Sequence, residues 1–477
     1  MLKLYNTLSR KKEILRPFAK AQGEKLKFFI CGPTVYDFSH LGHARTYIAF
    51  DMIVKYLRQK GYDVFYLQNI TDLDDKIIKR AEEKNITPQK LARDFEKEYL
   101  KDIKALKITS VSKYARATDY IKEIISQTER LLKKGFAYQI EDGIYFDILK
   151  FKDYGKLSRR TVLRAEDGVS RIDESVKKIN KGDFCLWKFS KPEEPTWTSP
   201  WGQGRPGWHI EDTAITEKFF GSQYDIHGGA RDLIFPHHEA EISQMEAISG
   251  KKPLVKYWLH TGFLTVDGQK MSKSLGNFIT IQDFLKNHSP RLLRFLVIKS
   301  HYRSPIDYSE KVISQTKKEL ERIDEFIDKL LRPNLHSLKS GRFGLLKFKN
   351  AFDNAMNDDF NTSKAIAVIF NLINKGNAII AQNKLSSSDA KNILGFLKII
   401  DKFFGFIFWQ KSENKQPQRL LSLVKQRQKY REQDNWQKAD EMREEIKKLG
   451  YSIEDTSKGP VIKRSLASHL EAKLLST

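Results

Sequence analysis

The chain has 477 residues, enough for two to four domains that each bury a core. Its 84 Lys and Arg against 60 Asp and Glu give a formal charge of +24, which favours a polyanionic partner, although a lysine-rich proteome would also explain it. Two cysteines, Cys31 and Cys185, exclude a disulfide framework and indicate a reducing compartment. We find no apolar leader and no run that approaches bilayer length, so we expect a cytoplasmic protein without membrane segments.

The first part of the chain has the pattern of a doubly wound sheet. The apolar run 26–30 predicts a strand, residues 43–60 predict a helix, and residues 62–70 predict a second strand. This βαβ unit is typical of a Rossmann-type parallel sheet, in which ligands bind beyond the carboxyl ends of the strands. Cys31 and Thr71 fall at those ends. The predicted fold class is therefore α/β.

The pattern changes after about residue 115. Apolar residues at helical spacing from about residue 118 predict a capped helix that ends near Gly135, and Glu141-Asp142-Gly143 predicts a hairpin. Polar sequence follows to about residue 182. We therefore expect residues 115–200 to form an insertion within a catalytic domain that spans residues 1–310.

The rest of the chain is predicted to be mainly helical. Apolar residues spaced four and three apart between Val312 and Leu330 form one face of a helix. Similar stretches follow, which predicts a helical bundle over residues 311–410. A small unit rich in Lys, Arg and Gln occupies residues 419–477.

Two short segments far apart in the sequence indicate a site for ATP phosphates. His40-Leu41-Gly42-His43 opens the predicted helix, where backbone N–H groups and the helix dipole attract phosphate and imidazoles can donate hydrogen bonds. Gly42 leaves room for a nucleotide near the backbone. Lys270-Met271-Ser272-Lys273-Ser274 lies between two glycines and offers two ammonium groups to a pyrophosphate. Either string alone also fits ordinary loop chemistry.

The two strings in this order resemble the class I aminoacyl-tRNA synthetases, and the residues between them resemble the cysteinyl-tRNA synthetases. The resemblance extends to about residue 464. It implies a connective insertion in the catalytic domain and a C-terminal domain that reads the anticodon. The strings that carry it are Leu4-Tyr5-Asn6-Thr7, Cys31-Gly32-Pro33-Thr34-Val35-Tyr36, Asn69-Ile70-Thr71-Asp72 with Asp74-Asp75-Lys76, Gly204-Arg205-Pro206-Gly207-Trp208-His209-Ile210-Glu211, and Phe235-Pro236-His237-His238-Glu239.

The reaction that the resemblance implies has two steps. The carboxylate of L-cysteine attacks the α-phosphorus of ATP, which is bound with Mg²⁺, and the terminal ribose of the cysteine tRNA then attacks the adenylate. His40 and His43 would stabilise the transferring phosphoryl group, and Lys270 and Lys273 the departing pyrophosphate. We expect ATP, L-cysteine and the cysteine tRNA as partners, and a monomeric enzyme.

A metal site is the second expectation. His237 and Glu241 lie four residues apart and would share one face of a helix. The resemblance adds Cys31 and a second cysteine, but Asp212 stands at that second position. A carboxylate keeps the charge of a thiolate and binds zinc at about 2.0–2.2 Å, although the harder donor weakens the selection of thiophilic metals. We expect one Zn²⁺ per chain. Two alternatives stay open, namely that Asp212 is only an acceptor beside the site and that the metal is lost.

The resemblance also implies two sets of recognition residues, one for the substrate amino acid and one for the anticodon. Trp436 belongs to the second set, although its helical spacing alone would make it a core residue. The residues placed around the substrate amino acid are Thr71, Trp208, His209, His227 and Asp232. The residues at anticodon-reading positions are Arg431, Trp436, Asp440 and Asp455.

Two other functions remain compatible with parts of the sequence. A related ligase could join cysteinyl adenylate to a small amine, but it would not need an anticodon-reading unit. A tRNA-binding paralogue without catalysis would be expected to lose His40, His43 or Lys273, and all three are present.

Overall fold

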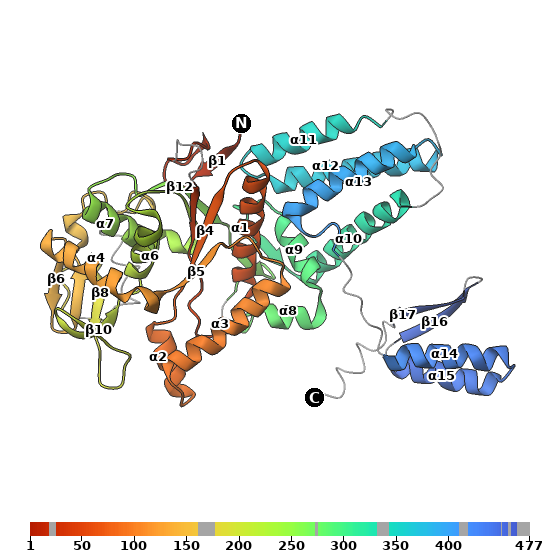
Figure 1. Ribbon diagram of the computed structural model, residues 1–477, viewed down its shortest axis with the longest axis horizontal. Coiled ribbons are helices and arrows are strands. Elements are labelled where there is room, and N and C mark those ends of the chain that lie inside the picture. Colours follow the sequence, from red (N-terminus) through yellow and green to blue (C-terminus); the bar gives the residue numbers. More distant parts are fainter. Residues whose placement is uncertain are drawn as a thin grey trace. The chain divides into compact units, whose positions relative to one another are not determined.

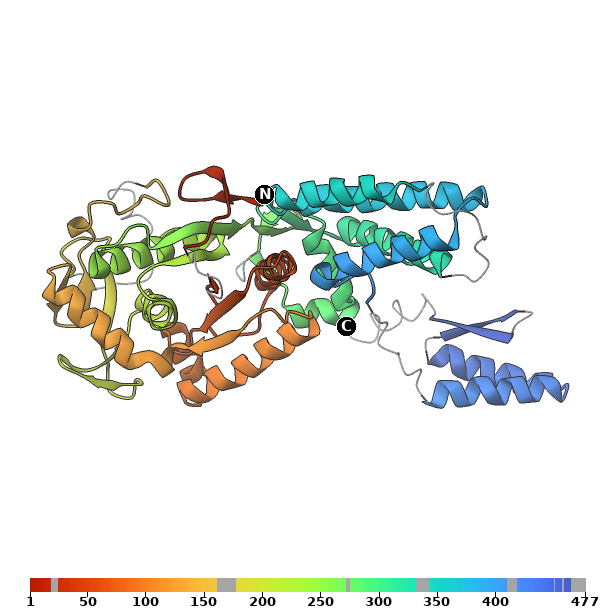
Figure 2. The same cartoon turned by 45° about the horizontal axis from the view of Figure 1, so that its top comes forward.

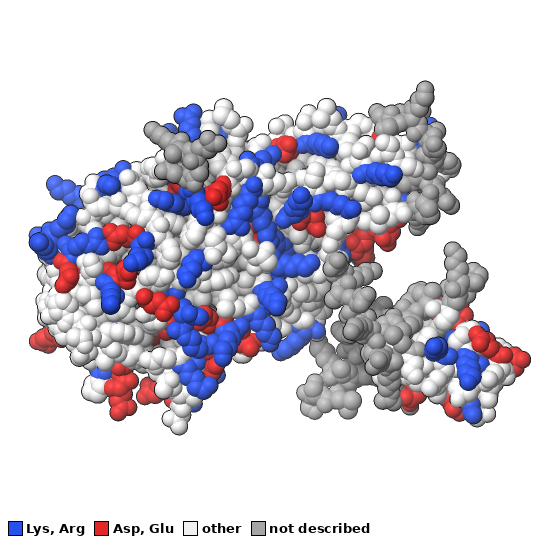
Figure 3. Space-filling view, viewed as in Figure 1, with Lys and Arg blue, Asp and Glu red and all other residues white. Residues whose placement is uncertain are grey.

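The computed structural model describes residues 1–18, 25–160, 177–271, 275–331, 343–409, 418–449, 451–456 and 459–464. The chain divides into two compact units, which are residues 1–408 (unit 1) and residues 409–477 (unit 2). Lys and Arg side chains are spread widely over the face of unit 1 that Figure 3 shows, with fewer acidic ones between them, in keeping with the net charge.

A five-stranded parallel sheet forms the centre of unit 1 (Figure 1). The helix α1 (Leu41–Gln59) joins β3 to β4, so the predicted βαβ unit and the α/β fold class are confirmed. The strands are nearly continuous apolar runs because both faces of the sheet are covered. In spatial order they are β12 (Val255–Thr261), β11 (Tyr224–Ala230), β3 (Leu26–Ile30), β4 (Val64–Ile70) and β5 (Lys113–Arg116).

Successive residues of β3 face opposite sides of this sheet. Phe28 and Ile30 join the core that contains α1, whereas Phe29 and Cys31 join the core that contains the helices α6 (Ile210–Phe220) and α7 (His237–Ser249). Cys31 is therefore directed towards α6 and α7. The fold positions the candidate metal ligands in this way.

An antiparallel sheet lies between β5 and β11 in the chain. The predicted helix is α4 (Ile121–Lys133), after η1 (Ala117–Tyr120), and the predicted hairpin joins β6 to β7 through Glu141 and Asp142. The limits 115 and 200 of the insertion stay a prediction, and β10, which pairs with β8 and β9 of this sheet, lies wholly beyond residue 200. The strands in spatial order are β6 (Ala137–Ile140), β7 (Gly143–Phe146), β8 (Phe184–Phe189), β10 (Gly202–Pro206) and β9 (Trp197–Ser199).

Smaller elements complete the part of unit 1 that precedes the helical bundle. They are the hairpin β1 (Lys3–Asn6) and β2 (Lys11–Ile14), the helices α2 (Asp75–Glu83), α3 (Pro88–Ala105), α8 (Ile281–Asn287) and α9 (Pro290–Ile298), the short helices η2 (Ile148–Lys150) and η3 (Arg231–Ile234), and a sheet of β14 (Gln269–Lys270), β13 (Leu264–Val266) and β15 (Ile306–Tyr308).

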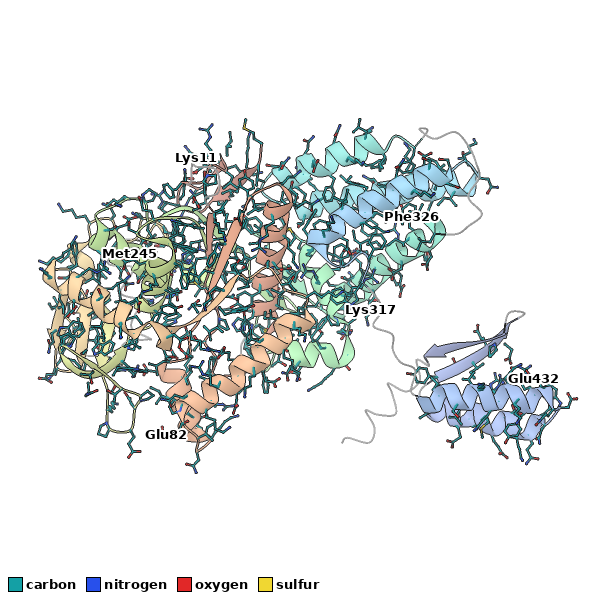
Figure 4. The ribbon with its side chains drawn as sticks, in the orientation of Figure 1. Lys11, Glu82, Met245, Lys317, Phe326 and Glu432 are labelled. Carbon is teal, nitrogen blue, oxygen red and sulfur yellow. The ribbon has the colours of Figure 1, made fainter. Side chains whose placement is uncertain are left out.

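Four helices form the predicted bundle and lie side by side in both views (Figure 1, Figure 2). Phe326 of α10 points into this bundle and is fully buried (Figure 4). Gly376 of α12 leaves room for it, because an added Cβ there would lie 2.4 Å from the Phe326 ring. The helices are α10 (Glu310–Leu330), α11 (Leu345–Asn357), α12 (Thr362–Ala381) and α13 (Ser387–Phe404).

The helix α12 corrects one sequence expectation, that no run approaches bilayer length. With 20 residues and a mean hydropathy of 1.2, it is the one helix in the described part of the chain that is long and apolar enough to cross a membrane. A core helix of a bundle has the same composition, and the α12 residues Ile366, Ile369 and Ile373 are buried in the core of unit 1. Packing therefore explains the apolar residues on the buried face of this helix.

Unit 2 is a helical hairpin with a two-stranded sheet. Its small core contains Leu420, Leu423, Ile446 and Ile453. The elements are α14 (Gln418–Glu432), α15 (Trp436–Lys448), β16 (Tyr451–Thr456) and β17 (Gly459–Arg464).

Candidate active site

A cavity of about 470 Å³ lies where the carboxyl end of β3 meets the start of α1. This is the edge of the sheet at which doubly wound folds bind ligands. The cavity brings both phosphate motifs together with residues expected around an amino acid. Of the predicted site residues, its wall contains Cys31, His40, Gly42, His43, Trp208, Asp232, Lys270 and Met271.

The two histidines of the first motif cap helix α1. His40 is the N-cap residue, and its Nδ1 accepts a hydrogen bond from the Gly42 N–H at 3.0 Å. The His43 Nδ1 accepts from the His40 N–H at 3.3 Å, and the two rings stack with centroids 3.8 Å apart. A Cβ on Gly42 would lie 2.7 Å from the His40 ring, so a larger residue here would displace that ring.

These caps decide which nitrogen of His43 can donate a hydrogen bond. Because Nδ1 of His43 accepts a backbone hydrogen bond, the neutral ring carries its proton on Nε2. Burial, and secondarily His40, lowers the pKa of His43 well below its usual value. The ring is therefore a neutral donor fixed at a helix N-terminus, which suits a phosphoryl oxygen.

The second motif begins at the end of β14, with Lys270. Lys270 is exposed and pairs with Thr265 in the β13–β14 hairpin. The chain beyond the loop is fixed to the first motif, because the Leu41 N–H donates to the Ile279 carbonyl at 3.1 Å. The predicted residues Ser272, Lys273 and Ser274 lie outside the described residues.

Behind the cavity, side chains that could ligate a metal form two overlapping sets. Both sets contain Cys31 and Glu241, and in each the four ligand atoms lie within 4.8 Å of one another. One set is completed by His227 and His238, and the other by Asp212 and His237. The predicted ligands Cys31, Asp212, His237 and Glu241 therefore do converge, while the His227 and His238 set was not expected.

The histidine set surrounds the thiol. The Nε2 atoms of His227 and His238 each lie 3.3 Å from the Cys31 Sγ. The other ring nitrogens are held as well, since the His227 Nδ1 lies 2.6 Å from the Tyr224 hydroxyl and the His238 Nδ1 lies 2.9 Å from the His260 Nε2. Such fixed rings are typical of metal-ligating histidines.

The carboxylate set lies on α6 and α7. The His237 Nε2 is 3.0 Å from the Asp212 Oδ2 and 3.3 Å from the Glu241 Oε1. The other Asp212 oxygen, Oδ1, accepts a hydrogen bond of 2.5 Å from the Asn69 Nδ2. Asp212 and Glu241 are both buried.

The chemistry of this cluster fits a metal cation. Burial, followed by Asp212 and Glu241, raises the pKa of Cys31 well above its usual value, and burial together with Asp212 raises the pKa of Glu241. No described lysine or arginine forms an ion pair with Cys31, Asp212 or Glu241, and the Glu241 Oε2 has no hydrogen-bond partner. One thiolate, carboxylates and imidazoles are donors that fit zinc, which would compensate these buried acids.

Some of the residues expected around the substrate amino acid line the cavity, and others do not. Trp208 stacks on His237 with ring centroids 4.6 Å apart, and its neighbour His209 approaches the His237 Nδ1 at 2.9 Å through its own Nδ1. Asp232, in η3, lines the cavity. Thr71 does not line it, because its hydroxyl donates to the Glu211 Oε2 at 2.9 Å.

Sequence reasoning gave no role to several residues that hold this site. They are Asn69, Glu211, His238 and His260, all of which are buried. His238 follows His237 directly and stands with it in one of the strings that carried the resemblance. Asn69 and Glu211 stand in strings that carried the resemblance, but their contacts join different elements and leave no local pattern.

Unit 2 contains the residues at anticodon-reading positions. Trp436 is 56% exposed, so its interpretation as a core residue is wrong, and the Arg431 guanidinium lies 5.8 Å from its ring centroid. Asp455 pairs with Arg431 at 2.5 Å and bidentately with Arg427 at 2.8 and 2.9 Å, which lowers the pKa of Asp455 to about 2. Asp440 is exposed on α15.

Three family models match the chain. They describe the tRNA synthetases class I (C) catalytic domain at residues 17–318, the DALR domain at 351–408, and the cysteinyl-tRNA ligase anticodon binding domain at 414–460.

Similar proteins of the same length are known. The cysteine–tRNA ligase of Methanococcus maripaludis strain S2 is 47% identical over 97% of this chain and 99% of its own, and that of Thermococcus onnurineus is 44% identical over the same shares. Among solved structures, the leucyl enzyme LeuRS of Agrobacterium radiobacter K84 in complex with tRNA has a TM-score of 0.60 at 11% identity, covering 81% of this chain and 84% of that one. Methionyl-tRNA synthetase of Mycobacterium tuberculosis has a TM-score of 0.58 at 16% identity, covering 81% and 88%. The two structures show the shared fold.

Proposed function

The chain belongs to the cysteinyl-tRNA synthetase family, and from this premise we propose how its residues carry out the reaction. Enzymes of this kind activate cysteine with ATP and transfer it to the cysteine tRNA. The observation that carries the proposal is one cavity that contains His40, His43 and Lys270 beside Cys31 and Trp208. The match to an anticodon-binding domain argues against a ligase that acts on a small amine, because such an enzyme would not need that domain.

We assign the adenylation step to the two motifs. His40 and His43 bind the transferring phosphoryl group at the start of α1, and Lys270 and Lys273 bind the pyrophosphate of Mg·ATP. The neutral, capped His43 supports this role, because a fixed donor needs no reorganisation as charge develops on the phosphoryl oxygens. Little covalent chemistry is required of the protein beyond positioning.

We assign cysteine recognition to a zinc ion held by Cys31, Asp212, His237 and Glu241. Zinc would bind the substrate thiolate, a bond that serine cannot match, so the site selects cysteine without an editing domain. Trp208, His209, His227, Asp232 and Thr71 would surround the amino acid, with Thr71 acting from behind the cavity wall through its bond to Glu211.

The buried charges favour this ligand set over the one that contains His227 and His238. A metal held by the two histidines would leave Asp212 outside the ligand set, as a buried carboxylate that faces the Asn69 amide and the His237 ring and has no described lysine or arginine beside it. A metal held by Asp212 and His237 compensates both carboxylates and the thiolate of Cys31 together.

Metal analysis of two matched variants tests the assignment. Asp212→Ala should lose zinc and cysteine-dependent ATP–pyrophosphate exchange together, because one ligand is removed. His238→Ala removes a side chain that is also buried and lies 3.3 Å from the Cys31 Sγ, and it should keep about one zinc per chain. The reverse result, with zinc lost only in His238→Ala, would move the metal to the histidine set.

The recognition of tRNA is assigned to unit 2. We propose that Trp436 stacks on an unpaired anticodon base and that Arg431, Asp440 and Asp455 bond to base edges. The exposure of Trp436 supports this role.

We also propose that the enzyme is a cytoplasmic monomer, and sedimentation velocity at micromolar concentration would test its oligomeric state.

A further inference from the structure

The metal site proposed above contains a carboxylate at the position where the resemblance implies a cysteine. The two donors differ in one respect that the fold must resolve. A thiolate offers a single atom to a metal, whereas a carboxylate offers two equivalent oxygens. A monodentate carboxylate ligand therefore requires that something else holds its second oxygen.

Asn69 lies at the correct place to do this. It stands near the carboxyl end of β4, is buried, and uses both ends of its amide. The Oδ1 atom accepts the Gly32 N–H at 2.5 Å, which fixes the amide orientation because a backbone N–H can only donate. The Nδ2 atom therefore faces the other way and donates to the Asp212 Oδ1 at 2.5 Å.

The second oxygen of Asp212, Oδ2, faces the other proposed metal ligands. This oxygen lies 3.0 Å from the His237 Nε2, and His237 in turn lies 3.3 Å from Glu241. The two oxygens of Asp212 thus have separate partners, Asn69 for Oδ1 and the ligand cluster for Oδ2. Asn69 and Asp212 are both almost fully buried, so water cannot replace Asn69 as the partner of Oδ1.

We propose that Asn69 is a positioning residue that makes Asp212 a working metal ligand in this chain. It holds Oδ1 and so presents Oδ2 alone to the metal. This inference rests on the proposed ligand set of Cys31, Asp212, His237 and Glu241. It predicts that Asn69 matters for metal affinity when residue 212 is an aspartate and matters much less when it is a cysteine.

Asn69 also has contacts that do not involve Asp212. Its amide holds the backbone of Gly32, next to Cys31, and lies 3.3 Å from the Thr71 hydroxyl. A single substitution would therefore disturb the site in more than one way. A double-mutant cycle with residue 212 separates the contact with Asp212 from the others, because those other contacts are present in both backgrounds.

The experiment compares four proteins, which are the native enzyme, Asn69→Ala, Asp212→Cys and the double variant. Zinc affinity is measured by competition with a chromophoric chelator, and the cobalt-substituted proteins are compared by their visible spectra. In the native background, Asn69→Ala should weaken zinc binding by about 10–100-fold and alter the cobalt spectrum. In the Asp212→Cys background, the same substitution should have a much smaller effect on both.

Each other outcome overturns the inference. Equal losses in the two backgrounds would show that Asn69 acts through Gly32 and Thr71, and an unchanged affinity in the native background would show that Oδ1 needs no partner. If Asn69→Ala does not fold, as judged by near-ultraviolet circular dichroism, Asn69→Ser is measured in its place with the same two backgrounds.

Failure of the ligand assignment itself is distinguishable. If Asp212→Ala keeps its zinc, the proposed metal site is wrong, and Asn69 has no metal-positioning role. If Asp212→Ala loses zinc and Asn69→Ala does not, the metal site stands and only the role of Asn69 is rejected.

Discussion

Replacing His43 tests the assignment of the phosphate site. His43 makes one backbone hydrogen bond as part of the helix cap, to the His40 N–H at 3.3 Å, and its Nε2 proton is available to a phosphoryl oxygen. Loss of one preorganised donor costs about 2.7–4 kcal/mol of transition-state stabilisation, which is about 10²–10³-fold in rate. His43→Ala should therefore slow cysteine-dependent ATP–pyrophosphate exchange by that factor. Cysteine binding should change little.

The same substitution has a separate effect on stability. It removes half of the capping box at the start of α1, which is worth about 0.5–2 kcal/mol. His43→Asn is a control, because its side-chain oxygen can still accept the His40 N–H, so it should recover stability without recovering the rate. Thermal unfolding and exchange kinetics on the same samples separate the two effects.

The pH dependence of the exchange gives a further check on His43. Because burial and the neighbouring His40 hold the pKa of His43 well below its usual value of about 6.5, the ring is neutral from that pH up to about pH 8. The ratio of the native rate to the His43→Ala rate should then be constant over this range. A ratio that titrates near neutral pH, or a native rate in His43→Ala, would refute the assigned role.

Three further substitutions have expected outcomes. Trp436→Ala should weaken tRNA aminoacylation by about 1–3 kcal/mol and leave tRNA-independent exchange unchanged, whereas equal loss in both assays would make this residue structural. Arg294→Met breaks a fully buried ion pair with Asp51 at 2.6 Å and should lower the free energy of unfolding by about 3–5 kcal/mol, as measured by denaturant titration; a loss below 1 kcal/mol would contradict this. Burial raises the pKa of Asp102 to about 7, so the folded state binds a proton that the unfolded state releases near pH 4, and stability falls as pH rises between these values. Asp102→Asn should remove that fall. If the free energy of unfolding of the variant still falls with pH as steeply as that of the native protein, Asp102 does not cause the fall.

Local rules were sufficient for the parts of the structure that depend on neighbours in sequence. The βαβ unit followed from apolar runs, and the position of His40 at a helix N-terminus followed from the turn before it. The hairpin at Glu141 and Asp142 followed from its turn residues. In each case the residues that determine the structure lie within one turn or strand of each other.

The remaining features depend on contacts between distant elements. Asn69 from β4 meets Asp212 from α6, and no spacing rule joins residues 143 positions apart. Trp436 has the period of a core position, but it is the first residue of α15, beyond the apolar contacts between α14 and α15. The apolar helix α12 satisfied a membrane criterion because composition does not record what covers a helix.

The most direct test of the proposed mechanism is X-ray absorption at the zinc edge, measured on the native enzyme with and without substrate. Without substrate, we expect one sulfur scatterer at about 2.3 Å, from Cys31, together with nitrogen and oxygen ligands. Saturating cysteine should add a second sulfur at a similar distance, and serine should add none. An unchanged spectrum with cysteine, or an enzyme that holds no metal and still prefers cysteine to serine, would contradict recognition of the substrate through its thiolate.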